Sequence, residues 1–164
     1  MIEYRVGDLF EYEGEAIAHG CNTKGLMGAG IAKIVAERYP EVHRFYVKSC
    51  GPYVPACDLF VPGDAQVILV DAQDRFVVNL ATQDHPGAHA TYWWVMLSMA
   101  NMFERLRLLE IDAVAIPRIG CGIGGLKWHG VEEVIKVAQA HVPGVKVVVY
   151  THPGETDKFQ QEAK

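Results

Sequence analysis

Gly25-Leu-Met-Gly-Ala-Gly30 and Gly120-Cys-Gly-Ile-Gly-Gly125 are the two stretches that decide the fold of this chain. Each follows a predicted strand and comes before a predicted helix. Glycine allows a positive φ and lets the backbone approach a ligand without an intervening Cβ. A helix N-terminus presents free N–H groups and the positive end of its dipole to an anion. One such cluster alone is more simply a tight turn, but two in matching contexts favour a ligand with more than one phosphate.

Strands and helices are predicted to alternate along the chain. Strands are expected at 4–6, 16–19, 66–70, 75–80, 113–117 and 145–151, and helices at 31–39, 41–50, 92–109 and 131–141. The helices are predicted from apolar residues near i, i+3, i+4 spacing, and the strands from short β-branched or apolar runs between turn residues. This alternation indicates an α/β sheet with helices on both faces. The early strands are expected to form hairpins, which make the sheet mixed rather than purely parallel.

The length of 164 residues fits one domain, with a core at about 2–152 and a polar tail at 153–164. No signal peptide is recognised at the Met1 end, and no apolar run approaches the roughly 18 residues of a membrane span. We therefore expect a cytoplasmic chain without membrane contact. The four cysteines show neither a CxxC pair nor zinc-ligand spacing, so we expect reduced thiols and no metal site.

The net charge of −5, without a run of lysine or arginine, limits the partners of the chain. Sequence-independent binding of nucleic acid requires a basic surface, so we do not expect this kind of binding. If an anionic ligand binds, backbone N–H groups must hold it, because the net charge does not attract it.

The second glycine stretch also satisfies the dinucleotide pattern G-x-G-x-x-G through Gly120, Gly122 and Gly125. In a dinucleotide-binding fold, a carboxylate about 20 residues later holds the ribose at the end of the next strand. Here that strand ends in Tyr150-Thr-His152, with no acid before Glu155. Neither stretch ends in Gly-Lys-Ser/Thr, so a Walker loop is excluded as well.

Four motifs together resemble the macrodomain family. They are Val6-Gly-Asp-Leu9, Ala18-His-Gly-Cys-Asn22, Met27-Gly-Ala-Gly-Ile-Ala32 and Ile116-Pro-Arg-Ile-Gly-Cys-Gly-Ile-Gly-Gly-Leu-Lys-Trp128. The last is similar to the branch that removes terminal ADP-ribose from proteins and ADP-ribose from DNA. The resemblance implies a three-layer α/β/α fold around a mixed, mostly parallel sheet of about six strands. It also implies ADP-ribose as the ligand, lying across the strand ends, with no cofactor.

The resemblance assigns a role to individual residues. Asp8 would accept a hydrogen bond from the adenine amino group, Leu9 would add its backbone N–H, and Asn22 would contact the distal ribose. The alternative for Asp8 alone is a turn carboxylate, but its motif context favours the ligand role. The remaining expected ligand contacts are Cys21, Met27, Gly28, Ala29, Gly30, Ile31, Thr82, Ile119, Gly120, Cys121, Gly122 and Ile123, with Tyr150 and His152 flanking adenine.

Catalytic groups of the relatives are missing from this chain. The glycohydrolase branch uses a lysine after the strand that corresponds to 77–81, an acid can stand at Gly124, and another group has an acid at Ala32. Near the distal ribose, Asp84 and His85 remain. Together they can act as a general base that activates water, because a carboxylate increases the basicity of a histidine.

Two functions stay open at this point. The chain either hydrolyses an ADP-ribose derivative, with an ADP-ribosylated macromolecule, DNA included, as a candidate partner, or it binds ADP-ribose without turnover. In the second case Asp84 and His85 belong to a polar loop that turns at Pro86-Gly87. Lys24 is the alternative catalytic group, although a lysine in an exposed loop is usually only solvated.

Overall fold

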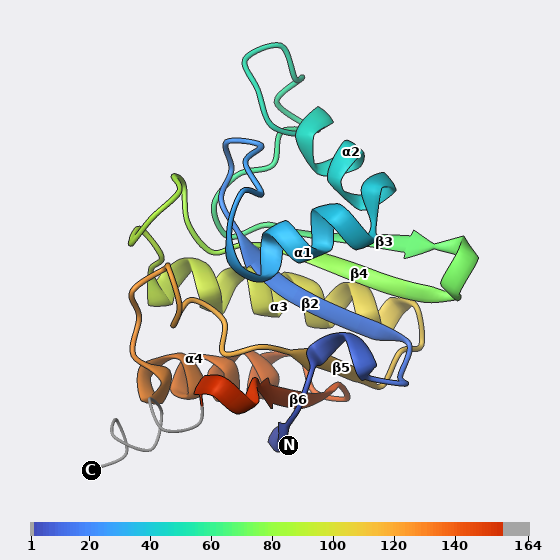
Figure 1. The fold of residues 1–164 in the computed structure, drawn as a ribbon, viewed down its shortest axis with the longest axis vertical. Helices are drawn as coiled ribbons and strands as arrows, with labels where there is room; N and C mark the ends of the chain where they lie inside the picture. The colour runs from blue at the N-terminus through green and yellow to red at the C-terminus, as the bar shows by residue number, and fades with distance from the viewer. Residues whose placement is uncertain (1, 156–164) are drawn as a thin grey trace.

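A six-stranded sheet forms the centre of the computed structural model, which describes residues 2–155 (Figure 1). The strand order is β1-β6-β5-β2-β4-β3. The strands are β1 (Ile2–Val6), β2 (Ala16–Cys21), β3 (Ala65–Val70), β4 (Arg75–Ala81), β5 (Ala113–Ile116) and β6 (Lys146–Thr151). All neighbouring pairs are parallel except β3 and β4, which are antiparallel. The predicted mixed, mostly parallel sheet is thereby confirmed.

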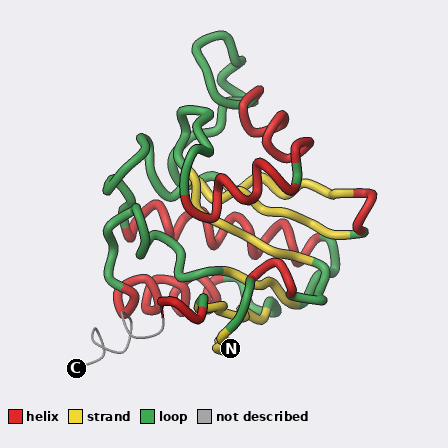
Figure 2. Tube along the Cα trace, viewed as in Figure 1, coloured by secondary structure: helices red, strands yellow, loops and turns green. Residues whose placement is uncertain are grey.

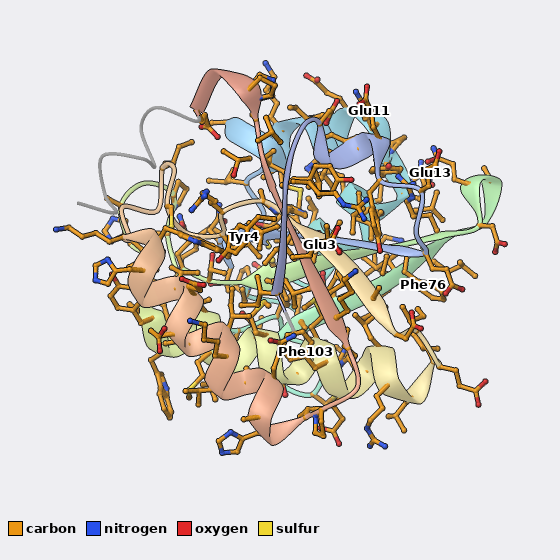
Figure 3. All side chains as sticks on the ribbon, turned by 90° about the horizontal axis from the view of Figure 1, so that it is seen from below. Glu3, Tyr4, Glu11, Glu13, Phe76 and Phe103 are labelled. Atoms are coloured by element: carbon orange, nitrogen blue, oxygen red, sulfur yellow. The ribbon has the colours of Figure 1, made fainter. Side chains whose placement is uncertain are left out.

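Helices cover both faces of this sheet. They are α1 (Gly30–Arg38), α2 (Pro40–Lys48), α3 (Tyr92–Leu108) and α4 (Trp128–His141). Three short 3-10 turns are η1 (Leu9–Glu11), η2 (Asp71–Gln73) and η3 (Pro153–Glu155). Figure 3 shows α3 and α4 on one side of the sheet, near the labelled Phe103, and Glu11 and Glu13 on the other side. The predicted three-layer α/β/α arrangement is therefore present.

Two layers of apolar side chains hold the helices to the sheet, because successive strand residues point to opposite faces. Val114 and Ile116 of β5 pack with Phe103 and Leu106 of α3, whereas the intervening Ala115 packs on the other face. A fully buried leucine, isoleucine or phenylalanine contributes about 1.5–3 kcal/mol relative to its exposed state.

The pairing of the first two strands differs from the prediction. β1 and β2 do not form a hairpin: β1 pairs in parallel with β6, from Ile2 opposite Val147 to Val6 opposite Thr151. β6 and β5 therefore lie between β1 and β2. The reason lies in the connection, where η1 buries Leu9 and Phe10 against one face of the sheet instead of turning back along β1. Only β3 and β4 make the sheet mixed.

Loops gather at the carboxyl ends of the parallel strands (Figure 2). α1 begins and α3 begins at this edge, so it is the edge where helix N-termini and strand ends meet. Of the predicted tail, Pro153–Glu155 forms η3, and residues 156–164 lie outside the described residues. No helix within residues 2–155 is both long and apolar enough to cross a membrane.

A line of buried polar side chains crosses three strands beneath α1 and α2. His19 of β2 stands opposite Asn79 of β4, which stands opposite Gln66 of β3. His19 Nε2 lies 2.7 Å from Asn79 Oδ1, and Asn79 Nδ2 donates to Gln66 Oε1 at 3.2 Å. His19 Nδ1 is buried and has no hydrogen-bond partner in the described part of the chain. Burial lowers the pKa of His19 to about 4, although the bond to Asn79 opposes the shift.

The lowered pKa of His19 predicts a loss of stability in acid. The folded state resists protonation, whereas the unfolded histidine takes up a proton near pH 6.5, so stability falls as the pH drops from there towards the folded pKa. We expect the free energy of unfolding to fall by about 2 kcal/mol more between pH 7 and pH 4.5 in the native chain than in His19→Gln. Urea unfolding at both pH values measures this difference, and parallel losses in the two proteins would contradict it.

Candidate ligand-binding site

Three loops converge at the carboxyl edge of the sheet. They are the first glycine loop (22–30), the second glycine loop (118–126) and the β4–α3 loop (82–91). A Cβ on Gly30 would lie 3.5 Å from Ile123 Cδ1, so the Ile123 side chain of the second glycine loop reaches the end of the first. The β4–α3 loop touches both, because Thr23 Oγ1 donates to the Asp84 carbonyl at 3.2 Å and a Cβ on Gly125 would lie 3.1 Å from Ala88 Cβ. The predicted phosphate loops therefore belong to one surface.

The glycines of these loops serve two purposes. Gly120 and Gly125 have φ values of +75° and +81°, which other residues rarely adopt, so the turn itself requires them. Gly28 and Gly122 have no positive φ, and a Cβ on either would meet no protein atom within 4 Å. The fold does not require glycine at Gly28 or Gly122. A ligand that approaches the backbone closely would require it.

Unpaired backbone amides lie in both glycine loops. Ala29 precedes α1 in an extended conformation, and no side chain caps the N-terminus of this helix. In the second loop, Cys121 and Leu126 donate their amides to carbonyl groups of the same loop. The three amides of Gly122, Ile123 and Gly124 have no backbone partner within residues 2–155. Consecutive free amides of this kind form a concave site for an anion.

The residues expected at adenine lie together at the ends of β1 and β6, where the Gly7 amide donates to the Thr151 carbonyl at 3.0 Å. Asp8 Oδ1 accepts from the Phe10 amide at 2.9 Å, and Asp8 Oδ2 lies 3.8 Å from Arg38 Nη2. Asp8 therefore caps η1, and Leu9 next to it is buried.

The ring of Tyr150 is half-buried and meets the ring of Tyr12 edge-on, with 6.1 Å between their centroids, while His152 is exposed. One side of this end of the site is therefore aromatic.

At the expected distal ribose, Asn22 is tied into the protein. Its side chain is buried, Oδ1 accepts from the Lys24 amide at 2.8 Å and from the Tyr46 hydroxyl at 2.9 Å, and Nδ2 donates to the Leu26 carbonyl at 2.7 Å. An amide nitrogen carries two hydrogens, so one remains for a ligand. Tyr46 is a residue that no motif of the sequence indicated. Its apolar neighbours on α2 made it resemble ordinary core.

Several other expected contacts have buried side chains. The structure buries the side chains of Cys21, Met27, Thr82, Ile119 and Cys121. Burial also raises the pKa of the Cys21 thiol well above its ordinary value, which keeps this thiol protonated and unreactive. The part of these residues that can face a ligand is the backbone, whereas Ile123 exposes half of its side chain.

The side chains of Asp84 and His85 are within hydrogen-bonding distance of each other on the β4–α3 loop. Asp84 Oδ2 lies 2.8 Å from His85 Nδ1, and the hydrogen bond from His85 lowers the pKa of Asp84. The Gln83 side chain donates to the carbonyl groups of His85 and Gly87, at 2.6 and 3.1 Å, and so shapes the loop. A carboxylate on Nδ1 fixes the ring and leaves Nε2 directed elsewhere, an arrangement that suits a general base.

The structure also explains why one expected acid is absent. A Cβ on Gly124 would lie 2.7 Å from the Gly120 carbonyl oxygen and 2.8 Å from Ala90 Cβ. The second glycine loop therefore has no room for a carboxylate at this position. In the described part of the chain, no group of three His, Cys, Asp or Glu side chains is arranged to hold a metal ion.

Comparisons with known proteins agree with this geometry. A DNA ADP-ribosyl glycohydrolase of Mycobacterium tuberculosis is 32% identical over 155 residues, which are 94% of this chain and 43% of the relative. An ADP-ribose 1″-phosphate phosphatase of Lodderomyces elongisporus is 28% identical over 82% of this chain and 90% of its own. The chain thus spans less than half the length of the curated glycohydrolases that it matches.

A solved structure and a family model complete the comparison. The macrodomain of Mycobacterium tuberculosis DarG matches with a TM-score of 0.80 and 32% identity, over 92% of this chain and 97% of that one. The Macro domain family model matches residues 18–135. This match takes in both glycine loops and more than two thirds of the chain, and with the six-stranded sheet it shows that the chain belongs to the Macro domain family.

Proposed function

We propose that this chain binds ADP-ribose and hydrolyses an ADP-ribose derivative. The observation that carries the binding proposal is the pair of neighbouring glycine loops: the start of α1 is uncapped, three amides of the second loop have no backbone partner within residues 2–155, and the Ile123 side chain of the second loop reaches Gly30. Two adjacent groups of amides suit the two phosphates of one pyrophosphate. Backbone donors also suit a chain whose net charge is −5, because they bind phosphate without lysine or arginine.

We place the adenosine and the distal ribose at opposite ends of the surface formed by the two glycine loops. Asp8 and Tyr150 lie at one end, beside the ends of β1 and β6. Asn22 and the pair Asp84–His85 lie near the other, where Thr23 joins the first glycine loop to the β4–α3 loop. Since β2 and β4 are paired up to Cys21 opposite Ala81, these groups stay together as the strands end.

Hydrolysis at the distal ribose requires an activated nucleophile. We assign this role to water held by His85 Nε2, with Asp84 orienting the ring through Nδ1. Relatives named as a glycohydrolase and as a phosphatase support turnover, and the reactions that we propose are hydrolysis of an ADP-ribosyl adduct, of O-acetyl-ADP-ribose or of the 1″-phosphate.

The second candidate is a reader module that binds ADP-ribose without turnover. It is favoured by Gly124, where the packing against Ala90 leaves no room for an acid, and by Ala32, whose methyl group cannot transfer a proton. ADP-ribosylated protein, ADP-ribosylated DNA, O-acetyl-ADP-ribose and ADP-ribose 1″-phosphate, incubated in parallel with the chain, separate the two functions. Cleavage of any one supports the enzyme, and survival of all four supports the reader.

Calorimetric titration of the native chain and of Gly122→Val with ADP-ribose tests the binding site. We expect saturable binding to the native chain and a loss of affinity of at least about 100-fold in the variant, because the branched side chain occupies the approach of a phosphate. Gly122→Ala should lose less, since its side chain is smaller. Neither variant should melt at a clearly lower temperature, because the space around Gly122 is empty of protein.

Two results would contradict the binding proposal. If calorimetry detected no binding to the native chain at millimolar ADP-ribose, ADP-ribose would be excluded as the ligand. If folded Gly122→Val bound ADP-ribose with unchanged affinity, the second glycine loop would be excluded as a phosphate-binding site.

His85→Ala tests the proposed base on whichever substrate is cleaved. We expect the rate to fall roughly 100-fold or more, while the dissociation constant of ADP-ribose stays nearly the same, because the base acts on water and not on the bound ligand. His89→Ala is the matched control: its ring centroid lies 5.9 Å from that of His85, and no carboxylate pairs with it in the described part of the chain. An equal rate in native chain and His85→Ala would exclude the pair Asp84–His85.

A further inference from the structure

The hydroxyl of Tyr46 connects α2 to the first glycine loop. The side chain is fully buried on α2, and its oxygen lies 2.8 Å from the Asn22 carbonyl oxygen and 2.9 Å from Asn22 Oδ1. The Leu26 amide donates to the same oxygen at 3.1 Å. A hydroxyl has one hydrogen and can accept as well, so Tyr46 donates to Asn22 and accepts from Leu26. Residues at both ends of one loop segment thus meet at a single oxygen atom.

The side chain of Asn22 closes the same segment from within. It accepts from the Lys24 amide and donates to the Leu26 carbonyl, so every bond of this group runs to Tyr46 or to the loop. The segment 22–26 is therefore held by a buried network rather than by regular secondary structure. Such a network restricts the segment, because the side chains of Asn22 and Tyr46 are buried and bond to each other and to the loop backbone.

The rest of α2 and the residues after it support the loop by packing. A Cβ on Gly25 would lie 3.5 Å from Cys50 Cβ and 3.9 Å from Val47 Cα, and Gly25 itself has a φ of +75°. The ring of Tyr46 meets the ring of Phe60 edge-on at 5.9 Å, which fixes the direction of its hydroxyl. The loop is thus seated against α2 in its middle, while β2 and α1 hold its two ends.

We propose that Tyr46 is a positioning residue for the ligand site. Its hydroxyl fixes Asn22 and the backbone of 22–26, so that the loop presents the amides at the start of α1 to a phosphate and the free N–H of Asn22 to the distal ribose. This inference rests on the proposed binding of ADP-ribose. Order that exists before binding does not have to be created by the ligand, so it raises affinity.

The substitution Tyr46→Phe tests this role, because it keeps the buried ring and removes only the oxygen. We expect ADP-ribose to bind about 10-fold more weakly by calorimetry, and the Leu26 amide to exchange its hydrogen at least about 10-fold faster in the ligand-free protein. Tyr39→Phe is the matched control: Tyr39 is also buried beside α2, and within the described residues its side chain has no hydrogen bond to the first glycine loop. It should change neither quantity.

The outcomes separate this inference from the proposed function. A native chain that does not bind ADP-ribose overturns both the proposed function and the role of Tyr46 in it. Binding by the native chain with equal affinity in Tyr46→Phe overturns the positioning role alone, whatever the exchange rates. Equal losses in Tyr46→Phe and Tyr39→Phe overturn it too, because they reflect general destabilisation.

Hydrogen exchange in the native chain provides a test that does not depend on the variant folding. The Leu26 amide donates to a buried oxygen, so it should be protected from hydrogen exchange in the absence of ligand. This is expected although Leu26 lies in a loop and its side chain is exposed. Exchange at the rate of an open chain would overturn the positioning role.

Discussion

The parallel pairing of β2 with both β4 and β5 is the interaction on which the site depends. Parallel strands end at the same edge of a sheet, so the segments that follow β2, β4 and β5 must emerge side by side. These segments are the first glycine loop, the β4–α3 loop and the second glycine loop. An antiparallel partner on either side of β2 would place its following loop at the opposite edge and divide the site.

This arrangement suits an anionic ligand on an acidic chain. The charge of −5 is distributed over a surface on which several cations are already paired, such as Arg38 near Asp8 and Lys136 with Glu133. Binding energy for a phosphate must then come from dipoles held in fixed directions. Backbone amides supply them without ordering long side chains, so the conformation of the loops carries the affinity.

The sequence predicted the features that depend on local chemistry. The glycine clusters indicated loops in which positive φ is allowed, as found at Gly120 and Gly125, and the helix after Gly30 followed from apolar spacing. The partner of β1 was not predictable, because Val6 opposite Thr151 is a contact between the two ends of the chain. Tyr46 was missed for the same reason: nothing near it in sequence shows that its hydroxyl meets Asn22. Long-range contacts of this kind decide how the motif residues are held.

The packing of the second glycine loop against the β4–α3 loop connects the absence of an acid at position 124 with the base that we propose on the β4–α3 loop. Ala90 lies where a side chain on Gly124 would project, and Ala88 lies beside Gly125. Thr23 donates to the Asp84 carbonyl, so the segment that carries Asp84 and His85 also lies against the first glycine loop. A side chain at position 124 would meet the Gly120 carbonyl oxygen of its own loop as well as Ala90 of the β4–α3 loop, so both segments would have to shift. The glycine at 124 therefore follows from the packing of these two loops, and it is consistent with a base on the β4–α3 loop.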